Sequence, residues 1–235
     1  MTRALLSWSS GKDSAWALHL IRQKKEHEIV GLLTTFNRAA DRVAMHGVRR
    51  TLVQAQAEAA GVPLWEVDLP WPCSNQDYEC AMKAACEKAV AAGIECMIFG
   101  DLFLRDIREY REKQLQGTGL EPVFPLWLAP TGELAREMID SGVRAKLACV
   151  DCKQLGREFA GREFDAQLLS DLPTASDPCG ENGEFHSFVY AGPMFKREIP
   201  VQVGEVVIRE GFAYADLLPV SPTCHPEALT LPCPL

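Results

Sequence analysis

The chain lacks any long apolar run and any apolar leader, and both absences limit where the protein works. None of its apolar runs reaches the roughly 18 residues that a membrane-spanning helix needs. Residues 1–8 are too short and too soon polar to form a signal peptide. We therefore expect a cytoplasmic protein that does not enter a membrane.

Basic residues are also scarce relative to acidic ones. The sequence has 24 Lys and Arg against 32 Asp and Glu, a formal net charge of -8. Proteins that bind the backbone of nucleic acid present a basic surface, so this balance argues against a nucleic-acid partner. Hydrophobic residues at 47% and charged residues at 24% are ordinary globular proportions, and 235 residues suffice for one large or two small domains.

Paired cysteine motifs are missing as well. The nine cysteines are odd in number and irregularly spaced, which in a non-secreted chain indicates reduced thiols. Cys149 and Cys152 form a single CxxC without the second pair of a structural zinc site, and we interpret them as buried thiols. Cys179 is a candidate reactive thiol because it lies beside a polar turn described below.

Apolar runs and amphipathic stretches alternate along the first half of the chain. The strand-like runs cover residues 4–7, 29–36, 64–69 and 96–99, and the helical stretches cover residues 14–22, 48–60, 75–92 and 106–115. Strand and helix in regular alternation, with short connections, predict right-handed crossovers. The fold class expected is α/β with a parallel, Rossmann-like sheet.

The pattern changes after residues 122–125. Helices are predicted over residues 131–141 and 164–172, and strands over residues 145–150, 185–190, 199–203, 205–208 and 212–218. We therefore divide the chain into an α/β domain (residues 1–125), a smaller α+β domain (residues 126–220) and a proline-rich tail (residues 221–235).

The most informative segment, residues 7–14, lies between the first strand and the first helix. Its small residues allow a tight turn whose N–H groups, with the helix N-terminus, can bind phosphate. Lys12 adds a mobile positive charge, and Asp13 could hold Mg²⁺. The spacing fits neither Walker A nor GxGxxG. The alternative is a polar turn in which Ser10 or Asp13 caps the helix, and we favour the phosphate site.

A second polar segment, residues 177–186, leads directly into a predicted strand. Glu181 and Glu184 flank Asn182 and Gly183, and such a turn can direct both carboxylates toward an amine, a hydroxylated substrate or a second Mg²⁺. Asn-Gly between strands is equally typical of a hairpin turn with exposed glutamates. The residues alone leave both interpretations open.

Single polar residues near the ends of the predicted strands are weaker candidates. Asp101 follows Gly100 at the carboxyl end of a parallel strand, where open α/β sheets bind ligands. The arginines at positions 105, 108 and 111 share one side of a helix, and we favour a solvent-exposed face over an anion site. His46, beside Met45 and Gly47, is either a loop residue near the nucleotide or a polar surface residue, and we favour the surface residue.

Residues 9–14 resemble the SGGxDS loop of the PP-loop ATP pyrophosphatases, with Ser10 where that family usually has glycine. Further matching segments are Gly100-Asp101-Leu102-Phe103, Tyr110-Arg111-Glu112, Phe124-Pro125-Leu126-Trp127 and residues 177–186, which contain GENGEF. Together they resemble the diphthine-ammonia ligase family across roughly residues 5–218. That family adenylates a carboxylate with ATP, releases pyrophosphate and forms an amide with ammonia, on an adenine nucleotide alpha hydrolase-like fold.

The resemblance implies a role for each matching residue. Nucleotide binding is implied for Ser9, Ser10, Gly11, Lys12, Asp13, Ser14, Thr35, Phe36 and Gly100. Acceptor binding is implied for Asp101, Gly180, Glu181, Asn182, Glu184 and His186. Catalytic roles are implied for Lys12, Asp13, Glu181 and Glu184, and Mg²⁺ binding for Asp13 and Asp101.

Asn182, His186 and Ser187 depart from the GEGGEFET of members that make diphthamide on elongation factor 2. The short GENGEFH form is similar to bacterial members, so we expect the chemistry to transfer but not the acceptor. The expected partners are ammonia, a small-molecule or protein carboxylate, and a second copy in a homodimer. The alternatives are a PP-loop sulfur transferase acting on tRNA, which would require Cys149 or Cys152, and a nucleotide sensor without turnover.

Overall fold

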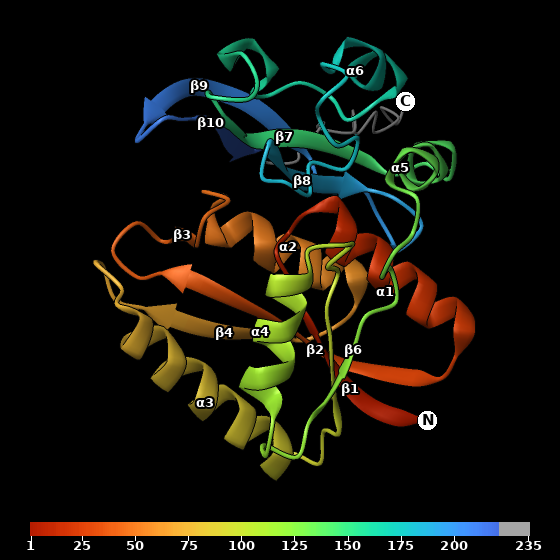
Figure 1. The fold of residues 1–235 in the computed structure, drawn as a ribbon, viewed down its shortest axis with the longest axis vertical. Coiled ribbons are helices and arrows are strands. Elements are labelled where there is room, and N and C mark those ends of the chain that lie inside the picture. The colour runs from red at the N-terminus through yellow and green to blue at the C-terminus, as the bar shows by residue number, and fades with distance from the viewer. Residues whose placement is uncertain (221–235) are drawn as a thin grey trace, which may run out of the picture.

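A computed structural model describes residues 1–220, which form two sheets with helices between them (Figure 1). The predicted tail, residues 221–235, lies outside the described residues. No helix within residues 1–220 is both long enough and apolar enough to cross a membrane.

The larger sheet is mostly parallel, and β1 lies at its centre. Its strands are β1 (Thr2–Ser7), β2 (His27–Asn37), β3 (Arg42–Val43), β4 (Leu64–Leu69), β5 (Cys96–Ile98) and β6 (Glu121–Val123). The parallel strands run in the order β4-β2-β1-β5-β6, and β3 pairs antiparallel with the end of β2. The loops that follow β1, β2 and β5 therefore meet at one edge, where α/β sheets bind ligands.

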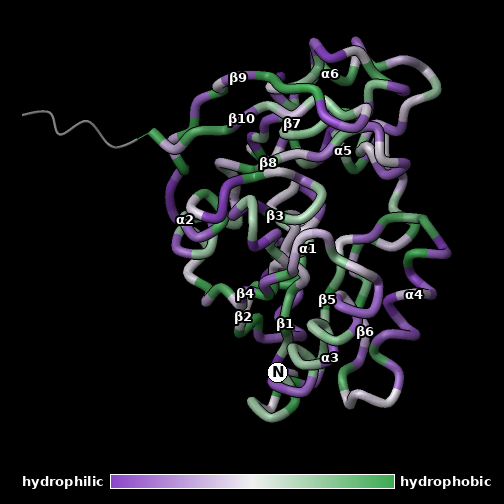
Figure 2. Tube along the Cα trace, turned by 90° about the vertical axis from the view of Figure 1, so that its left-hand side faces the viewer, coloured by the Kyte–Doolittle hydropathy of each residue, from purple (hydrophilic) through white to green (hydrophobic). Residues whose placement is uncertain are grey.

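Helices cover both faces of this sheet, since parallel strands need burial on both sides. The helices are α1 (Lys12–Lys24), α2 (Arg50–Ala60), α3 (Asn75–Ala91) and α4 (Arg105–Leu115). Leu6 of β1 belongs to the core that contains α1 and α2, whereas Leu5 points to the opposite face, where it packs in a second core with α3. The side view of Figure 2 shows α1 and α2 between the two sheets.

The smaller sheet is antiparallel, in the order β8-β7-β10-β9. It contains β7 (Arg144–Asp151), β8 (Phe185–Ala191), β9 (Val201–Arg209) and β10 (Phe212–Pro219), and it is accompanied by α5 (Thr131–Asp140), α6 (Ala166–Asp171) and a 3-10 turn at Arg157–Phe159. One apolar cluster runs through both halves of the chain, from Trp8 and Trp16 to Phe185 and Val189. The halves therefore share a core.

The predicted fold class is confirmed, and three strands differ from prediction. β3 has two residues and β6 has three, with Pro122 in the middle, so neither shows an alternating pattern. The strands predicted over residues 199–203 and 205–208 are one strand, β9. It continues through Gly204 because its pairing with β10 shifts register there, between Ala215 and Leu217.

Candidate active site

A pocket of about 250 Å³ opens at the edge where the loops after β1, β2 and β5 meet, and the turn before β8 closes it. Ten of the predicted site residues line it: Ser9, Gly11, Lys12, Asp13, Ser14, Gly100, Asp101, Gly180, Glu181 and His186. The pocket thus brings together the polar loop at α1 and the turn at residues 177–186, which lie far apart in the sequence.

The loop before α1 is held by hydrogen bonds from α2 and from β8, which belongs to the other half of the chain. Ser10 has a left-handed φ of 70°, and its carbonyl accepts hydrogen bonds from Val189 N at 3.0 Å and from Gln56 Nε2 at 3.0 Å. Gly11 occupies the N-cap position of α1, so the alternative that Ser10 or Asp13 is the cap is wrong. The N–H of Lys12 donates to Ser187 Oγ of β8 at 3.1 Å, and the N–H groups that follow it lie at the helix terminus, where anions bind.

Lys12 is fully buried, with 2% of its surface exposed. Its Nζ donates to both carboxylate oxygens of Asp13, at 3.0 and 2.9 Å, and to the carbonyl of Cys179. The same Nζ lies over the rings of Phe164 and Phe185, 5.5 and 5.4 Å from their centroids. Lys12 is therefore fixed between the two halves rather than mobile.

Asp13 and Lys12 change each other's ionisation. Burial raises the pKa of Asp13, and the charge of Lys12 only partly opposes this effect. Burial lowers the pKa of Lys12, but the charge and hydrogen bond of Asp13, together with the charges of Cys179 and Glu181, raise it by more, so the net shift is upward. Lys12 and Asp13 therefore form an ion pair, and the charged lysine is part of the pocket wall.

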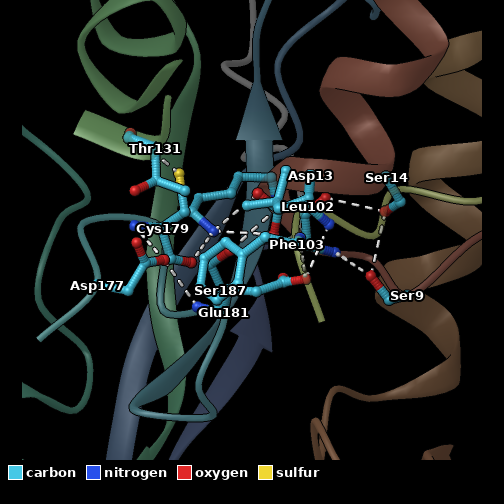
Figure 3. A network of polar contacts seen from close by, with 12 residues as sticks. Ser9, Asp13, Ser14, Leu102, Phe103, Thr131, Asp177, Cys179, Glu181 and Ser187 are labelled. Atoms are coloured by element: carbon cyan, nitrogen blue, oxygen red, sulfur yellow. Dashed lines mark hydrogen bonds and ion pairs between the residues drawn. The ribbon is translucent and has the colours of Figure 1, made fainter. Parts of the chain in front are cut away.

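Three carboxylates, Asp13, Asp101 and Glu181, face the same pocket. Glu181 Oε1 accepts hydrogen bonds from the backbone N–H groups of Leu102 at 2.8 Å and Phe103 at 3.4 Å (Figure 3). Burial, helped by the charges of Asp13 and Asp101, raises the pKa of Glu181 to about 7, and the two hydrogen bonds oppose this rise. Glu181 can therefore take up or release a proton near neutral pH.

Asp101 lies opposite Arg111, whose Nε is 3.8 Å from its Oδ2. Burial raises the pKa of Asp101, Arg111 lowers it, and Asp13 adds to the rise. The carboxylate oxygens suit Mg²⁺ by chemistry. Within residues 1–220 no three such side chains are arranged as a complete metal site. A magnesium ion here would need further oxygen ligands from phosphate and water, and Mg²⁺ in proteins is usually bound in this way.

Glu184 and Asn182 lie in the turn but do not line the pocket. Glu184 is 1% exposed, and its Oε1 accepts from Asp177 N at 2.7 Å and from Asn182 Nδ2 at 3.2 Å. The carboxylate of Asp177 accepts from Glu181 N at 2.9 Å. The two glutamates therefore diverge, Glu181 into the pocket and Glu184 into the turn, and neither is the exposed residue of a hairpin.

Ser10, Thr35 and Phe36 also stay out of the pocket lining. Phe36 is fully buried, with the guanidinium of Arg50 4.1 Å from its ring centroid. The carbonyl of Thr35 accepts from Ala44 N at 3.1 Å. Adenine recognition at these positions stays a prediction, and their side chains do not take part in the pocket.

His46 lines the pocket, so its interpretation as a surface residue was wrong. Its ring stacks on that of His186, with centroids 4.3 Å apart and planes 15° apart. Burial lowers the pKa of His186 to about 4, helped by the charge of Lys12, and burial together with His186 lowers the pKa of His46 well below its ordinary value. Both rings are uncharged at neutral pH. No sequence motif marks His46, since only the fold brings it to His186.

Two family models match this chain. Residues 1–122 match the diphthamide synthase N-terminal domain and residues 130–217 match the diphthamide synthase C-terminal domain. The chain belongs to the diphthamide synthase family.

Relatives of this diphthamide synthase family member are named diphthine–ammonia ligase. The Danio rerio protein is 28% identical over 88% of this chain and 89% of its own length. The Schizosaccharomyces pombe protein is 27% identical over 85% of this chain, which spans only 36% of that protein. The Homo sapiens protein is 33% identical over 48% of this chain and 44% of its own length. A solved structure, described as a predicted subunit of tRNA methyltransferase from Methanocaldococcus jannaschii, aligns over 85% of this chain and 100% of its own, with a TM-score of 0.43 and 15% identity.

The cysteines and arginines singled out in this family member are mostly remote from the pocket. Cys149 is buried, as predicted, whereas Cys152 is exposed, so its interpretation as a buried thiol is wrong, and neither cysteine lines the pocket. Cys179 does, but burial raises the pKa of its thiol to about 12, so the sulfur stays protonated and the residue contributes its carbonyl to Lys12. Of the three arginines on α4, Arg111 alone lines the pocket within the described residues.

Proposed function

We propose that this protein is an ATP-dependent carboxylate–ammonia ligase of the diphthine–ammonia ligase type. A carboxylate oxygen of the acceptor attacks the α-phosphorus of ATP, the bond to the β-phosphate oxygen breaks, and pyrophosphate leaves. Ammonia then attacks the acyl-adenylate and releases AMP. The observation that carries the proposal is the meeting of the loop at residues 9–14 with Glu181 in one pocket, in a chain whose relatives bear that name.

The ATP half of the mechanism rests on residues 9–14. We propose that the N–H groups of α1 that follow Lys12 and the hydroxyls of Ser9 and Ser14 bind the phosphates, while the Lys12 side chain stabilises the charge that develops on pyrophosphate. Asp13 and Asp101 would hold Mg²⁺, which neutralises phosphate charge when bound. Because Asp13 pairs with Lys12 at 2.9 Å, phosphate oxygens would compete with this carboxylate for the Lys12 ammonium group.

The acceptor half rests on the turn before β8. We propose that Gly180, His186 and Asp101 contact the acceptor and that Glu181 takes the proton that ammonium must lose before it can attack. Asn182 and Glu184 act by supporting the turn, as their mutual hydrogen bond suggests. In this proposal residues 1–125 bind ATP and residues 126–220 bind the acceptor. Thr35 and Phe36 would meet adenine through their backbone.

The surroundings of the enzyme belong to the same proposal. It acts in the cytoplasm, where ATP and ammonium are available, and as a homodimer, the commonest assembly of such enzymes. The net charge of -8 favours a small-molecule or protein carboxylate over a nucleic acid as acceptor. A sulfur transferase has no comparable support, because neither Cys149 nor Cys152 reaches the pocket.

Isotope transfer tests the proposal directly. The protein is incubated with ATP, Mg²⁺, ammonium and carboxylates labelled with ¹⁸O, and the products are followed by mass spectrometry. We expect AMP and pyrophosphate, with one ¹⁸O carried into AMP from the acceptor. Asp13→Ala should abolish AMP formation, whereas Cys152→Ser should leave it unchanged. Formation of ADP and phosphate, or tight ATP binding without any turnover across the acceptors, would contradict the proposal.

A further inference from the structure

One carboxylate of the smaller sheet holds the loop that carries His46. This 42–49 loop, residues 42–49, is closed at its base by an antiparallel bridge between Arg42 and Arg49. Asp216 of β10 accepts from both arginines: from Arg42 Nη2 at 2.8 Å, and from Arg49 Nε and Nη2 at 3.0 and 2.6 Å. A single side chain, remote in sequence, thus binds both ends of the loop.

The tip of the 42–49 loop rests on the same face of β10. A Cβ placed on Gly47 would lie 2.9 Å from Tyr214 Cδ1, so the backbone of the loop contacts that ring. Gly47 O also accepts from Arg42 Nη1 at 2.7 Å. Tyr214 and Asp216 are two residues apart and share one face of the strand, whereas Ala215 between them is buried on the other. Asp216 lies where β9 and β10 shift register, a feature that redirects side chains.

The position of this loop determines which wall of the pocket His46 forms. The loop follows β2, and Asp101 follows β5, so they flank the phosphate-binding loop after β1 from opposite sides. The wall next to β2 carries the stacked rings of His46 and His186, while the wall next to β5 carries the carboxylates of Asp101 and Glu181. Uncharged imidazoles beside Lys12 can bind ligand oxygens through their N–H groups without repelling that lysine.

We propose that Asp216, which lies outside the pocket, is a positioning residue that holds His46 against His186 so that the two rings form the β2-side wall of the nucleotide site. The inference has two parts. The positioning of His46 by Asp216 concerns the protein alone, and the contact of the ring pair with nucleotide rests on the proposed function.

The first experiment tests the positioning without any substrate. The ring signals of the five histidines are assigned by single substitutions and titrated by NMR in the wild type and in Asp216→Ala. We expect the midpoint of His186 to rise from about 4 toward 6.5 in Asp216→Ala, because His46 no longer covers the ring. Asp171→Asn is the matched control, since it removes another arginine–carboxylate pair of the same half, with Arg162 at 2.6 Å. It should leave the His186 midpoint unchanged.

The second experiment measures ATP binding by calorimetry in a double-mutant cycle. We expect His46→Ala and Asp216→Ala each to raise the Kd for ATP about tenfold, and the double variant to be no weaker than either single one. Where Asp216→Ala does not fold, Asp216→Asn, which keeps the shape and one acceptor oxygen, replaces it in both experiments. A His186 titration midpoint that does not change in Asp216→Ala overturns the positioning role of Asp216. Losses of ATP affinity that add up in the double variant overturn its action through His46. If ATP does not bind the wild type at all, the proposed function fails while the titration still decides the positioning.

Discussion

Ser10 holds a backbone conformation that glycine adopts without strain, and it does so at the position where the resembling loops carry glycine. Its φ is 70°, and its buried hydroxyl has no hydrogen-bond partner within the described residues. A left-handed conformation costs a residue with a Cβ about 1 kcal/mol, so Ser10→Gly should raise the free energy of unfolding by that amount. Urea denaturation measures it. The matched control is Ser9→Gly, at a position without positive φ, which should bring no gain. A destabilised Ser10→Gly protein would refute the account.

Glu181 makes the stability of the protein depend on pH, and its burial determines whether stability rises or falls with pH. Burial raises its pKa from 4.5 to about 7 in the folded protein, so the folded state binds the proton more tightly than the unfolded chain. The contribution of this group to stability is fully present below about pH 4.5 and is lost as the pH rises through about 7. Glu181→Gln stays neutral, and its stability relative to the wild type should therefore rise across this window in thermal melts.

Asp171 provides a control of opposite sign for that experiment. The hydrogen bond from Arg162 lowers the pKa of Asp171, so its contribution is present above the ordinary carboxylate range and is lost as the pH falls. Asp171→Asn should thus show its largest deficit at neutral pH, not in acid. A Glu181→Gln protein whose relative stability falls with rising pH would contradict the assignment of a raised pKa.

The place of single residues in the pocket was predictable where they belong to a motif. Small and hydroxylated side chains between a strand and a helix indicate the site at residues 9–14. The polar turn that contains Glu181 indicates this residue in the same way. Lys12 shows the limit of such reasoning, because its partners Cys179, Phe164 and Phe185 come from the other half and turn a mobile charge into a buried one. His46 has no motif, so only the three-dimensional fold identifies it.

At the scale of elements, β5 approaches the first turn of α1 as closely as backbone permits. A Cβ on Gly100 would lie 2.9 Å from Ser14 N and 3.0 Å from the carbonyl carbon of Asp13, and backbone atoms cannot move aside individually. Gly100→Ala should therefore displace the start of α1, weaken ATP binding about tenfold, and destabilise the protein by about 1–3 kcal/mol. Calorimetry and urea denaturation check the two effects.

Gly132 provides the matched control for that substitution. It lies in α5, and a Cβ there would meet only a guanidinium nitrogen of Arg136 at 3.9 Å. Gly132→Ala should leave ATP binding unchanged and stabilise the helix slightly. Equal behaviour of the two variants would show that the contact between β5 and α1 does not control the site.

Elements with a clear period were predictable, and those without one were not. The four central helices and the strands β1, β2, β4 and β5 follow from apolar spacing, because each buries a face of fixed period. β3 exists because β2 extends beyond β1, whose pairing ends at Leu33, and Phe36 and Asn37 then pair with Val43 and Arg42. Pairing of this kind depends on tertiary structure, so two residues of sequence cannot reveal it.

At the scale of the whole molecule, the shared core predicts a single cooperative unfolding transition. Four of the five tryptophans, all but Trp127, lie within residues 1–125, so their fluorescence mainly reports the α/β half, and hydrogen exchange of β7 and β10 amides reports the other sheet. We expect both probes to give the same midpoint in urea within error. Two separate midpoints would mean that the halves fold independently and that the cluster linking Trp16 to Val189 contributes little.

The composition of the pocket was the least predictable feature. Each half of the chain could be assigned a fold class and a set of polar residues, but which residues would face each other depends on how α1 and α2 fit between the sheets (Figure 1). Glu184 illustrates this point. The sequence predicts a site role for Glu184 and Glu181 alike, but the packing of the turn directs Glu181 toward Leu102 and Glu184 toward Asp177. The spacing of two residues along the chain does not reveal whether their side chains point in the same direction.

Gln56 has a consequence for how proteins of this kind can diverge. Its buried amide accepts from Trp8 Nε1 at 2.8 Å and donates to the carbonyls of Ser10 at 3.0 Å and Val189 at 2.6 Å, so one side chain joins α2, the loop before α1 and β8. Because two of the three partners are backbone carbonyls, the side chains at positions 10 and 189 can change while these bonds persist. A change of Gln56 itself would instead leave buried polar groups unpaired in both halves at once, so position 56 is expected to vary less than the residues it joins.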